Sequence, residues 1–319
     1  MFTLPELEAT AALVHRHMPP TPQHRWPLLA ARTGVDVVVK HENHTPTGAF
    51  KVRGGIAYMD RLARERPGVR GVISATRGNH GQSLAWAGAR HGVPVTILVP
   101  HGNSVEKNAA MRAQGARLIE HGADFDAARA EAARLAAEQG LEFAPSFAPD
   151  LVRGVATYAL ELLRAEPGLA ALYVPVGLGS GICGCIMARD LLGLRTEIIG
   201  VQSVGAPAYA LSFAAGHVVQ TERAETLADG MATRQPDAGA LDIILKGAAR
   251  IVTVTDDEVR DAIRAYWTDT HNLAEGAGAA PLAALMQERA QWQGRAVGAV
   301  LCGGNIDLAL FQDWVLGGA

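Results

Sequence analysis

The 319 residues are 49% hydrophobic and 19% charged, with a formal net charge of −3 at pH 7, which is typical of a globular chain large enough for two domains. This balance excludes a strongly basic nucleic-acid footprint, and no apolar run reaches the length of a membrane span. The first residues lack the basic and apolar regions of a secretory signal, and three cysteines are too few for a disulfide framework. We therefore expect a cytoplasmic protein without nucleic-acid or membrane partners.

The first half of the chain predicts an N-terminal helix and then strands that alternate with helices. Thr3 has the position of an N-cap, and a Pro-rich connector over residues 19–22 follows the first helix. A β-branched run over residues 35–39 leads to a helix with apolar residues at Ile56, Met59 and Leu62. Further strands are expected over 71–75, 93–100 and 117–120, with helices over 81–89, 105–114 and 124–139. An irregular segment over 142–149 indicates a domain boundary.

The second half continues the same alternation. Helices are expected over 151–165, from about 182, and over 256–271, 281–290 and 306–314, with strands over 171–176, 196–202, 251–254 and 296–302. Residues 216–247 are weakly patterned, which predicts a loop-rich excursion. Alternation of this kind predicts an α/β fold with open parallel sheets and right-handed crossovers, in which ligand sites form at the carboxyl ends of the strands.

Lys51 lies where a turn becomes the start of a predicted helix. Gly48 breaks the backbone just before Phe50 and Lys51. An ammonium group that is partly buried and close to the positive end of a helix dipole has a lowered pKa, which makes it a usable nucleophile. Taken alone, this pattern is more often a solvated surface lysine, so the other motifs must decide.

A glycine-rich segment, Gly177-Leu-Gly-Ser-Gly181, follows a predicted strand and opens a helix. Its backbone N–H groups can converge on one phosphate at the helix N-terminus, although a plain tight turn is the competing interpretation. The chain has neither a Gly-x-Gly-x-x-Gly followed by a ribose-binding acid nor a Walker motif. A single phosphate group is therefore the favoured ligand.

Other polar residues also follow predicted strands. Thr76, Asn79 and His80 lie on a turn that enters a helix N-terminus and are suited to holding a carboxylate, whereas an N-cap explains only one of them. Glu275 lies in a Gly-rich turn, where a helix N-cap is the alternative, and Cys302 has the features of an ordinary buried thiol.

Two candidate metal sites fail on spacing. His41 and His44 are one residue too close for a zincin motif and lie in a turn, and Cys183 and Cys185 have no partner pair at metal-binding distance along the chain. We expect both pairs to be structural and no metal to be bound.

Six motifs occur together in one order: Lys51 in Thr-Gly-Ala-Phe-Lys-Val-Arg-Gly, the Gly-Asn-His turn, the Gly177 loop, Ala228-Asp-Gly230, Glu275-Gly-Ala-Gly and Cys302-Gly-Gly-Asn305. In this order the chain resembles the fold type II pyridoxal-phosphate enzymes, which have a tryptophan synthase β-like fold, and specifically the threonine/serine dehydratase and serine racemase family. The likeness spans about residues 20–310. It implies two domains, a large cofactor-binding one over 1–60 and 149–319 and a small substrate-clamping one over 61–148. It also implies pyridoxal 5'-phosphate, a small-molecule amino-acid substrate and a homodimer.

The resemblance implies a role for each motif residue. Lys51 would bond covalently to the cofactor and act as the catalytic base, with Phe50 and Gly230 on the two faces of the ring. Asn79 would hydrogen-bond the ring hydroxyl oxygen, and Cys302 would face the pyridine nitrogen. The phosphate would be held by Gly177, Leu178, Gly179, Ser180 and Gly181, and the substrate by Thr76, Arg77, Asn79 and His80. A neutral thiol leaves the pyridine nitrogen largely unprotonated, which suits elimination of a β-substituent.

Three departures from the family pattern refine this expectation. Arg77 replaces the serine that protonates the second face of the α-carbon in racemases, and a guanidinium is a poor proton shuttle. Residues 202–208 lack the two carboxylates of metal-dependent members, so no divalent cation is expected there. The chain also ends soon after Asn305, which predicts a catabolic enzyme without a regulatory domain.

The sequence thus predicts a carbon–nitrogen lyase that converts a 3-hydroxy amino acid to a 2-oxo acid and ammonia. Threonine or serine is the default substrate, and 3-hydroxyaspartate or β-phenylserine stays open. An amino-acid racemase is the alternative, and a non-catalytic cofactor-binding protein is a third hypothesis. The side-chain pocket is expected to form from Arg77, the Ser146-Phe147 region and residues 226–233.

Overall fold

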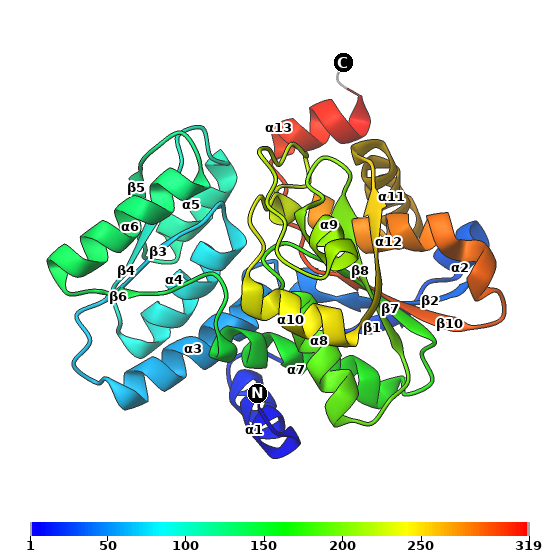
Figure 1. Ribbon diagram of the computed structural model, residues 1–319, viewed down its shortest axis with the longest axis horizontal. Helices are drawn as coiled ribbons and strands as arrows, with labels where there is room; N and C mark the ends of the chain where they lie inside the picture. The colour runs from blue at the N-terminus through cyan, green and yellow to red at the C-terminus, as the bar shows by residue number, and fades with distance from the viewer. Residues whose placement is uncertain (1, 318–319) are drawn as a thin grey trace.

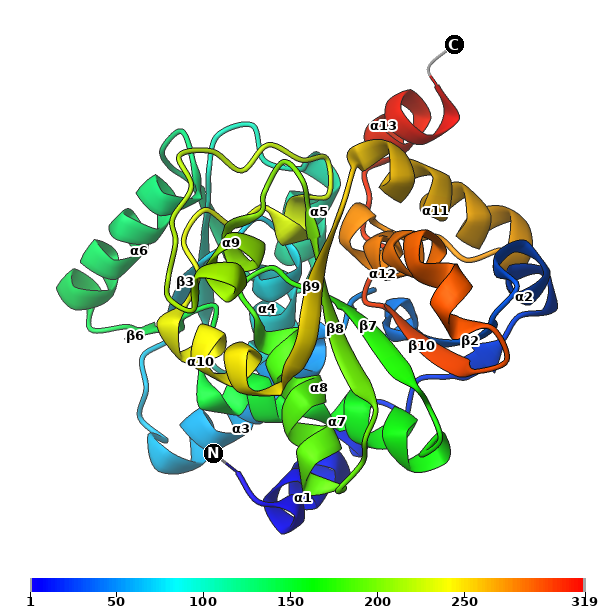
Figure 2. The ribbon, with the colours of Figure 1, turned by 45° about the vertical axis from the view of Figure 1, so that its right-hand side comes forward.

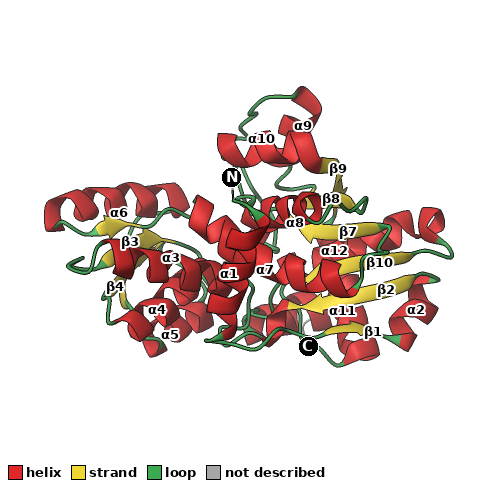
Figure 3. Ribbon diagram, turned by 90° about the horizontal axis from the view of Figure 1, so that it is seen from below, coloured by secondary structure: helices red, strands yellow, loops and turns green. Residues whose placement is uncertain are grey.

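The computed structural model describes residues 2–317 and contains two open sheets, each with helices packed on it (Figure 1). The larger sheet has the strand order β1-β2-β10-β7-β8-β9, and the smaller has the order β5-β4-β3-β6. Figure 3 shows the two sheets at opposite ends of the molecule, with α1 and α7 between them. All strand pairs are parallel except β1–β2, so the predicted fold class is confirmed.

The strands are short, and the central ones are apolar on both faces, as parallel sheets covered by helices require. In β2, for example, Val37, Val38 and Val39 are all buried. The strands are β1 (Gln23–Arg25), β2 (Asp36–His41), β3 (Val72–Ala75), β4 (Val95–Val99), β5 (Arg117–Glu120), β6 (Glu142–Phe143), β7 (Ala171–Pro175), β8 (Glu197–Ser203), β9 (Ala248–Val254) and β10 (Ala296–Leu301).

The helices begin and end where the local sequence provides caps. Thr3 caps the first helix in a capping box with Glu6, as predicted, and Thr255 forms the same motif with Glu258. The helices are α1 (Leu4–His15), α2 (Pro27–Thr33), α3 (Lys51–Glu65), α4 (Asn79–His91), α5 (Val105–Ala113), α6 (Phe125–Gln139), α7 (Pro149–Ala165), α8 (Ser180–Leu191), α9 (Ala208–Ala215), α10 (Ala238–Gly247), α11 (Asp256–Thr270), α12 (Gly276–Glu288) and α13 (Leu308–Leu310). Single helical turns are η1 (Glu42–His44), η2 (Asp229–Met231), η3 (Arg289–Trp292) and η4 (Phe311–Leu316).

Three expectations were wrong in detail. The excursion over 216–247 ends in a regular helix, α10, because Asp237 caps it and Leu241 and Ile244 bury one face. The helix expected over 281–290 begins earlier, at Gly276, and contains Pro281 in its interior. The segment over 142–149 is not wholly irregular, since its first two residues form β6 beside β3 and its last residue begins α7.

A buried ionic network holds the start of α3 in place. Arg53, two residues after Lys51, donates hydrogen bonds from Nε to Glu42 (2.7 Å) and from Nη1 to Glu161 (2.7 Å). The ammonium group of Lys40 donates to the other oxygen of Glu161 (2.6 Å). Arg53, Lys40 and Glu42 are fully buried, so two cations and two carboxylates neutralise one another inside the protein. This network ties α3 to β2, η1 and α7.

Replacing Glu161 with glutamine is expected to lower the free energy of unfolding by about 3–5 kcal/mol, because two buried cations then share one carboxylate. Burial raises the pKa of Glu161, but Arg53 and Lys40 outweigh it and lower that pKa to about 2. A carboxyl group with a lowered pKa stabilises the fold above its unfolded-state pKa of 4.5 and stops doing so as the pH falls towards 2. The difference between wild type and variant should therefore shrink between pH 5 and pH 2 in urea titrations. The exposed Glu138→Gln is the control, and equal stability of the Glu161 variant at pH 7 would contradict the expectation.

For the described part of the chain, no helix is both long enough and apolar enough to cross a membrane. The domain limits at 60/61 and 148/149, the cytoplasmic location and the homodimer stay predictions. Below, β3–β6 with α4, α5 and α6 are called the four-stranded half, and the larger sheet with its helices is called the six-stranded half.

Candidate active site

One pocket, with a cavity of about 410 Å³, opens at the carboxyl ends of strands from both sheets. Its walls include every residue to which the sequence assigned a catalytic, cofactor-binding or substrate-binding role: Phe50, Lys51, Thr76, Arg77, Asn79, His80, Gly177, Leu178, Gly179, Ser180, Gly181, Gly230 and Cys302. The segment between α9 and α10, shown above α9 in Figure 2, adds further lining residues from Arg223 to Gln235. The structure thus brings the predicted site residues together, while their individual roles stay predictions.

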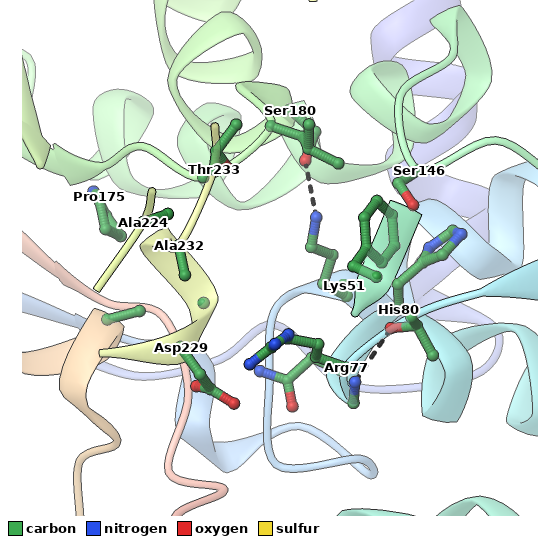
Figure 4. A pocket seen from close by; sticks show the side chains of 18 of the residues that line it. Lys51, Arg77, His80, Ser146, Pro175, Ser180, Ala224, Asp229, Ala232 and Thr233 are labelled. Atoms are coloured by element: carbon green, nitrogen blue, oxygen red, sulfur yellow. Dashed lines mark hydrogen bonds between the residues drawn. The ribbon is translucent and has the colours of Figure 1, made fainter. Parts of the chain in front are cut away.

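Lys51 is the first residue of α3, as predicted, and its amine faces the glycine-rich segment (Figure 4). Nζ donates a hydrogen bond to Ser180 Oγ (3.3 Å) and lies 5.2 Å from the centre of the Phe50 ring. Burial lowers the pKa of Lys51 to about 8, although Cys302 and Glu275 act in the opposite direction. Near physiological pH the neutral, nucleophilic form of this amine is therefore a minority, but a far larger one than for an exposed lysine.

The glycine-rich segment forms a concave backbone surface between β7 and α8. A Cβ atom at Gly177 would lie only 2.3 Å from the carbonyl oxygen of Gly230, so no side chain fits there. Gly179 is the N-cap of α8 and has a φ of 97°, a left-handed conformation that favours glycine. The free N–H groups of the helix start and the helix dipole make this surface suited to a phosphate.

The turn between β3 and α4 provides the opposite wall. Thr76 Oγ1 accepts a hydrogen bond from the Gly78 N–H (3.0 Å), which shapes the turn, and α4 begins at Asn79 rather than at the predicted residue 81. Burial lowers the pKa of His80 to about 3, so its imidazole is neutral and cannot attract a carboxylate as a cation. Figure 4 shows this ring on the Ser146 side of the pocket, and within residues 2–317 its Nε2 has no hydrogen-bond partner.

Cys302 joins the end of β10 to the turn that precedes Lys51. Its carbonyl oxygen accepts a hydrogen bond from the Phe50 N–H (2.9 Å). Burial raises the pKa of the Cys302 thiol well above its ordinary value, so the group is neutral at physiological pH. The chemical character predicted for this residue, a buried neutral thiol, is therefore what the structure has.

The sequence alone did not single out Lys107 as part of the pocket. This residue lies three positions after Ser104, the N-cap of α5, and its sequence surroundings are typical of an ordinary helix start at the surface. It lines the pocket together with Asp229 and Glu275. Phe147, in contrast, was expected in the side-chain pocket but lines a different cavity, between α7 and α10, whereas its neighbour Ser146 does line the site.

Metal ligands are not grouped in the described residues. No three side chains of His, Cys, Asp or Glu in residues 2–317 come close enough to hold an ion. Cys183 and Cys185 are buried, and the Cys185 thiol instead pairs with the Tyr158 hydroxyl (3.1 Å).

Comparison with known proteins identifies the family. Residues 14–303 match the family model described as pyridoxal-phosphate dependent enzyme. The chain is 38% identical to an L-threonine ammonia-lyase of Geobacter sulfurreducens over 87% of this chain and 69% of that protein. It is 31% identical to an L-threo-3-hydroxyaspartate ammonia-lyase of a Pseudomonas species over 93% of each chain. A crystal structure of a pyridoxal 5'-phosphate-dependent aspartate racemase superposes with a TM-score of 0.91 at 28% identity, covering 96% of this chain and 97% of that one.

The pocket fits the cofactor that this family uses. The backbone cradle that excludes a side chain at Gly177 suits the phosphate, and the desolvated Lys51 amine can bond to the aldehyde. The chain is therefore an enzyme of the pyridoxal-phosphate-dependent family, in the fold type II group of threonine/serine dehydratases and serine racemases, and its cofactor is pyridoxal 5'-phosphate.

Proposed function

We propose that the enzyme is an ammonia-lyase that converts a 3-hydroxy amino acid to a 2-oxo acid and ammonia by α,β-elimination. The observation that supports this most directly is the pairing of a desolvated lysine amine with a neutral thiol in one pocket. The amine provides the base, and the thiol does not provide the acidic partner that would hold the pyridine nitrogen protonated. The ammonia-lyases among the similar proteins support the same reaction class.

Different parts of the pocket would bind the cofactor phosphate, the cofactor ring and the substrate carboxylate. Residues 177–181 would bind the phosphate, Phe50 and Gly230 would contact the two faces of the ring, and Asn79 would donate to the ring hydroxyl oxygen. When bound, pyridoxal phosphate withdraws electron density from the α-carbon. The turn of residues 76–80 would bind the substrate carboxylate through the N-terminus of α4.

Lys51 would then move the proton. Its neutral amine removes the proton from the α-carbon, and the electron pair of that bond forms a double bond to the β-carbon. The bond between the β-carbon and its hydroxyl breaks, and the hydroxyl leaves as water with the proton that Lys51 took up. The enamine product tautomerises outside the site, and water replaces its nitrogen to give the 2-oxo acid and ammonia.

Arg77 supports an acidic member of the substrate class. Of the arginines that line the pocket, Arg129, Arg223 and Arg234 are ion-paired, whereas Arg77 forms no ion pair with any residue from 2 to 317. An arginine without a partner beside a substrate turn is suited to a second carboxylate, as 3-hydroxyaspartate has. Threonine and serine, which lack this group, would leave Arg77 to solvent.

The test is a panel of L-serine, L-threonine, L-threo-3-hydroxyaspartate and β-phenylserine in deuterated buffer. Release of 2-oxo acid from any of them is the expected result. Exchange or inversion at the α-carbon without a 2-oxo acid would instead mean a racemase, and neither reaction with any substrate would overturn the proposal. Similar solved structures include racemases, so the exchange measurement is necessary.

Replacing Arg77 with leucine is expected to reduce kcat/KM for 3-hydroxyaspartate about tenfold or more beyond any change for serine, because a charged hydrogen bond to the second carboxylate is lost. Arg195→Leu, which removes an exposed arginine outside the pocket lining, is the matched control. An Arg77→Leu enzyme with an unchanged ratio of the two kcat/KM values would show that Arg77 does not select the side chain.

A further inference from the structure

The side chain of Lys107 contacts three separate parts of the pocket wall. Its aliphatic stem passes beneath the turn of residues 76–80, where a Cβ atom at Gly78 would lie 2.4 Å from Lys107 Cδ. Its ammonium group donates a hydrogen bond to Asp229 Oδ2 on η2 (2.6 Å) and lies 3.7 Å from Glu275 Oε2 at the N-cap of α12. Lys107 comes from α5 in the four-stranded half, whereas both carboxylates belong to the six-stranded half.

The protein encloses two of these three charged groups, whereas the Asp229 side chain is 31% exposed. The side chains of Lys107 and Glu275 are 7% and 3% exposed. Burial by itself lowers the pKa of Lys107, but the two carboxylates outweigh it and raise that pKa above its ordinary value. Burial raises the pKa of Glu275 to about 7, against the opposing effect of the Lys107 ammonium group. Within residues 2–317, Lys107 is the only cation that forms an ion pair with Asp229 or Glu275.

Glu275 in turn determines how the Asn79 amide is oriented. Asn79 Nδ2 donates a hydrogen bond to Glu275 Oε1 (2.7 Å), and Asn79 Oδ1 accepts one from Asn305 Nδ2 (2.8 Å). The orientation of Asn305 is itself determined, because the same amide nitrogen donates to the carbonyl oxygen of Thr47 (2.8 Å). One N–H of Asn79 is left for the pocket. This is the donor that the cofactor role of Asn79 requires.

Asp229 determines the opposite wall. It directly precedes Gly230, whose carbonyl oxygen closes over Gly177 in the phosphate cradle. Asp229 is also part of the short turn η2, which has few hydrogen bonds of its own to hold it. The Lys107 ammonium group is therefore a direct support for the turn that contains Gly230.

We propose that Lys107 is a positioning residue that sets both walls of the cofactor site at once: it holds the Gly230 turn through Asp229 and the Asn79 amide through Glu275. The inference rests on the cofactor roles proposed for Gly230 and Asn79, and it does not depend on which substrate is eliminated. The ammonium group of Lys107 contacts the two carboxylates, and Lys107 therefore acts through them. Because Lys107 reaches across from the other half of the protein, both contacts form only when the two halves are closed on each other.

The experiment compares wild type with Lys107→Met, Lys107→Arg and the exposed control Lys246→Met as holoenzymes. The measured quantities are the dissociation constant of pyridoxal phosphate and the position of its absorbance band, neither of which requires turnover. Lys107→Met is expected to weaken cofactor binding about tenfold or more and to shift the band, since the charged hydrogen bond to Asp229 and the ion pair with Glu275 are both lost. Lys107→Arg should recover most of the cofactor affinity and most of the band position, because a guanidinium can also donate to two carboxylates. Lys246→Met should match wild type in both measurements.

Two combined variants separate positioning from general support of the fold. If Lys107 acts through the two walls, Lys107→Met should change the cofactor affinity much less in an enzyme that already carries Asp229→Asn and Asn79→Ala than it does in wild type. Additive effects, or a lowered melting temperature with unchanged affinity and absorbance, would overturn the proposal. Lys107→Met leaves Asp229 and Glu275 without a cation and can therefore fail to fold. In that case the double variant Lys107→Met/Glu275→Gln is used instead, and it is expected to show the same weaker cofactor binding and the same shift of the absorbance band. Failure of the elimination assay would leave these readouts intact, so the two proposals fail separately.

Discussion

Replacement of Lys51 with alanine is expected to reduce 2-oxo acid formation by at least about 10³-fold, the range seen when a group that acts directly on the reacting atoms is removed. The amine of Lys51 is the candidate for both the covalent link to the cofactor and the removal of the α-proton. Lys51 contacts residues 177–181 through the Ser180 hydroxyl and not through their backbone N–H groups, so the variant should still bind pyridoxal phosphate non-covalently.

Two measurements check this expectation. Product release is followed by the absorbance of the 2-oxo acid derivative, and cofactor content is followed by the absorbance of the protein after gel filtration. Lys246→Ala, which removes an exposed lysine on α10, is the control for the loss of a positive charge. Turnover near the wild-type rate in the Lys51→Ala enzyme would overturn the assignment of Lys51 and with it the proposed mechanism.

Replacement of Gly177 with alanine is expected to weaken cofactor binding by about 10- to 100-fold. The added methyl group would lie 2.3 Å from the Gly230 carbonyl oxygen, which belongs to the backbone and cannot rotate away. Either the cradle or the η2 turn must then move, and both contribute to the cofactor site. The affinity is measured by titrating the cofactor-free protein and following the absorbance.

Gly168→Ala is a matched control, because the same methyl group added at that turn would have no atom within 4 Å. It should leave the cofactor affinity as in wild type. Equal affinity in the Gly177 and Gly168 variants would mean that the close approach of Gly177 to Gly230 is not needed for binding. A loss in both would point to a general effect of removing glycine flexibility.

Local patterns were sufficient to predict most elements of the fold. The capping box at Thr3 and Glu6, the strand over 117–120 and the Lys51 helix start depend on neighbours within a few residues, so sequence spacing describes them well. The prediction was wrong where a tertiary contact decides the structure. Helix α10 forms because Leu241 and Ile244 bury one of its faces against the rest of the protein. Helix α12 continues through Pro281 because the helix is buried in the core around this residue.

In the site, too, some features follow from the local sequence and others depend on tertiary contacts. Glycine spacing indicated a phosphate cradle, and a lysine at a helix start indicated a nucleophile, because each depends on local backbone geometry. The lowered pKa of Lys51 depends on how much protein surrounds the amine, and the neutrality of His80 depends on burial by residues from other elements.

By itself, the sequence determined the family, the cofactor and the order of the site motifs along the chain, because these follow from residue types at short spacing. Only the tertiary structure decided that Lys107, Asp229 and Glu275 meet, since these residues are up to 168 positions apart and lie on separate elements. The same holds for Phe147, which adjoins Ser146 in the chain but faces another cavity. Adjacent side chains can point in opposite directions, and charges that are distant in sequence compensate one another only when folding has removed the water between them.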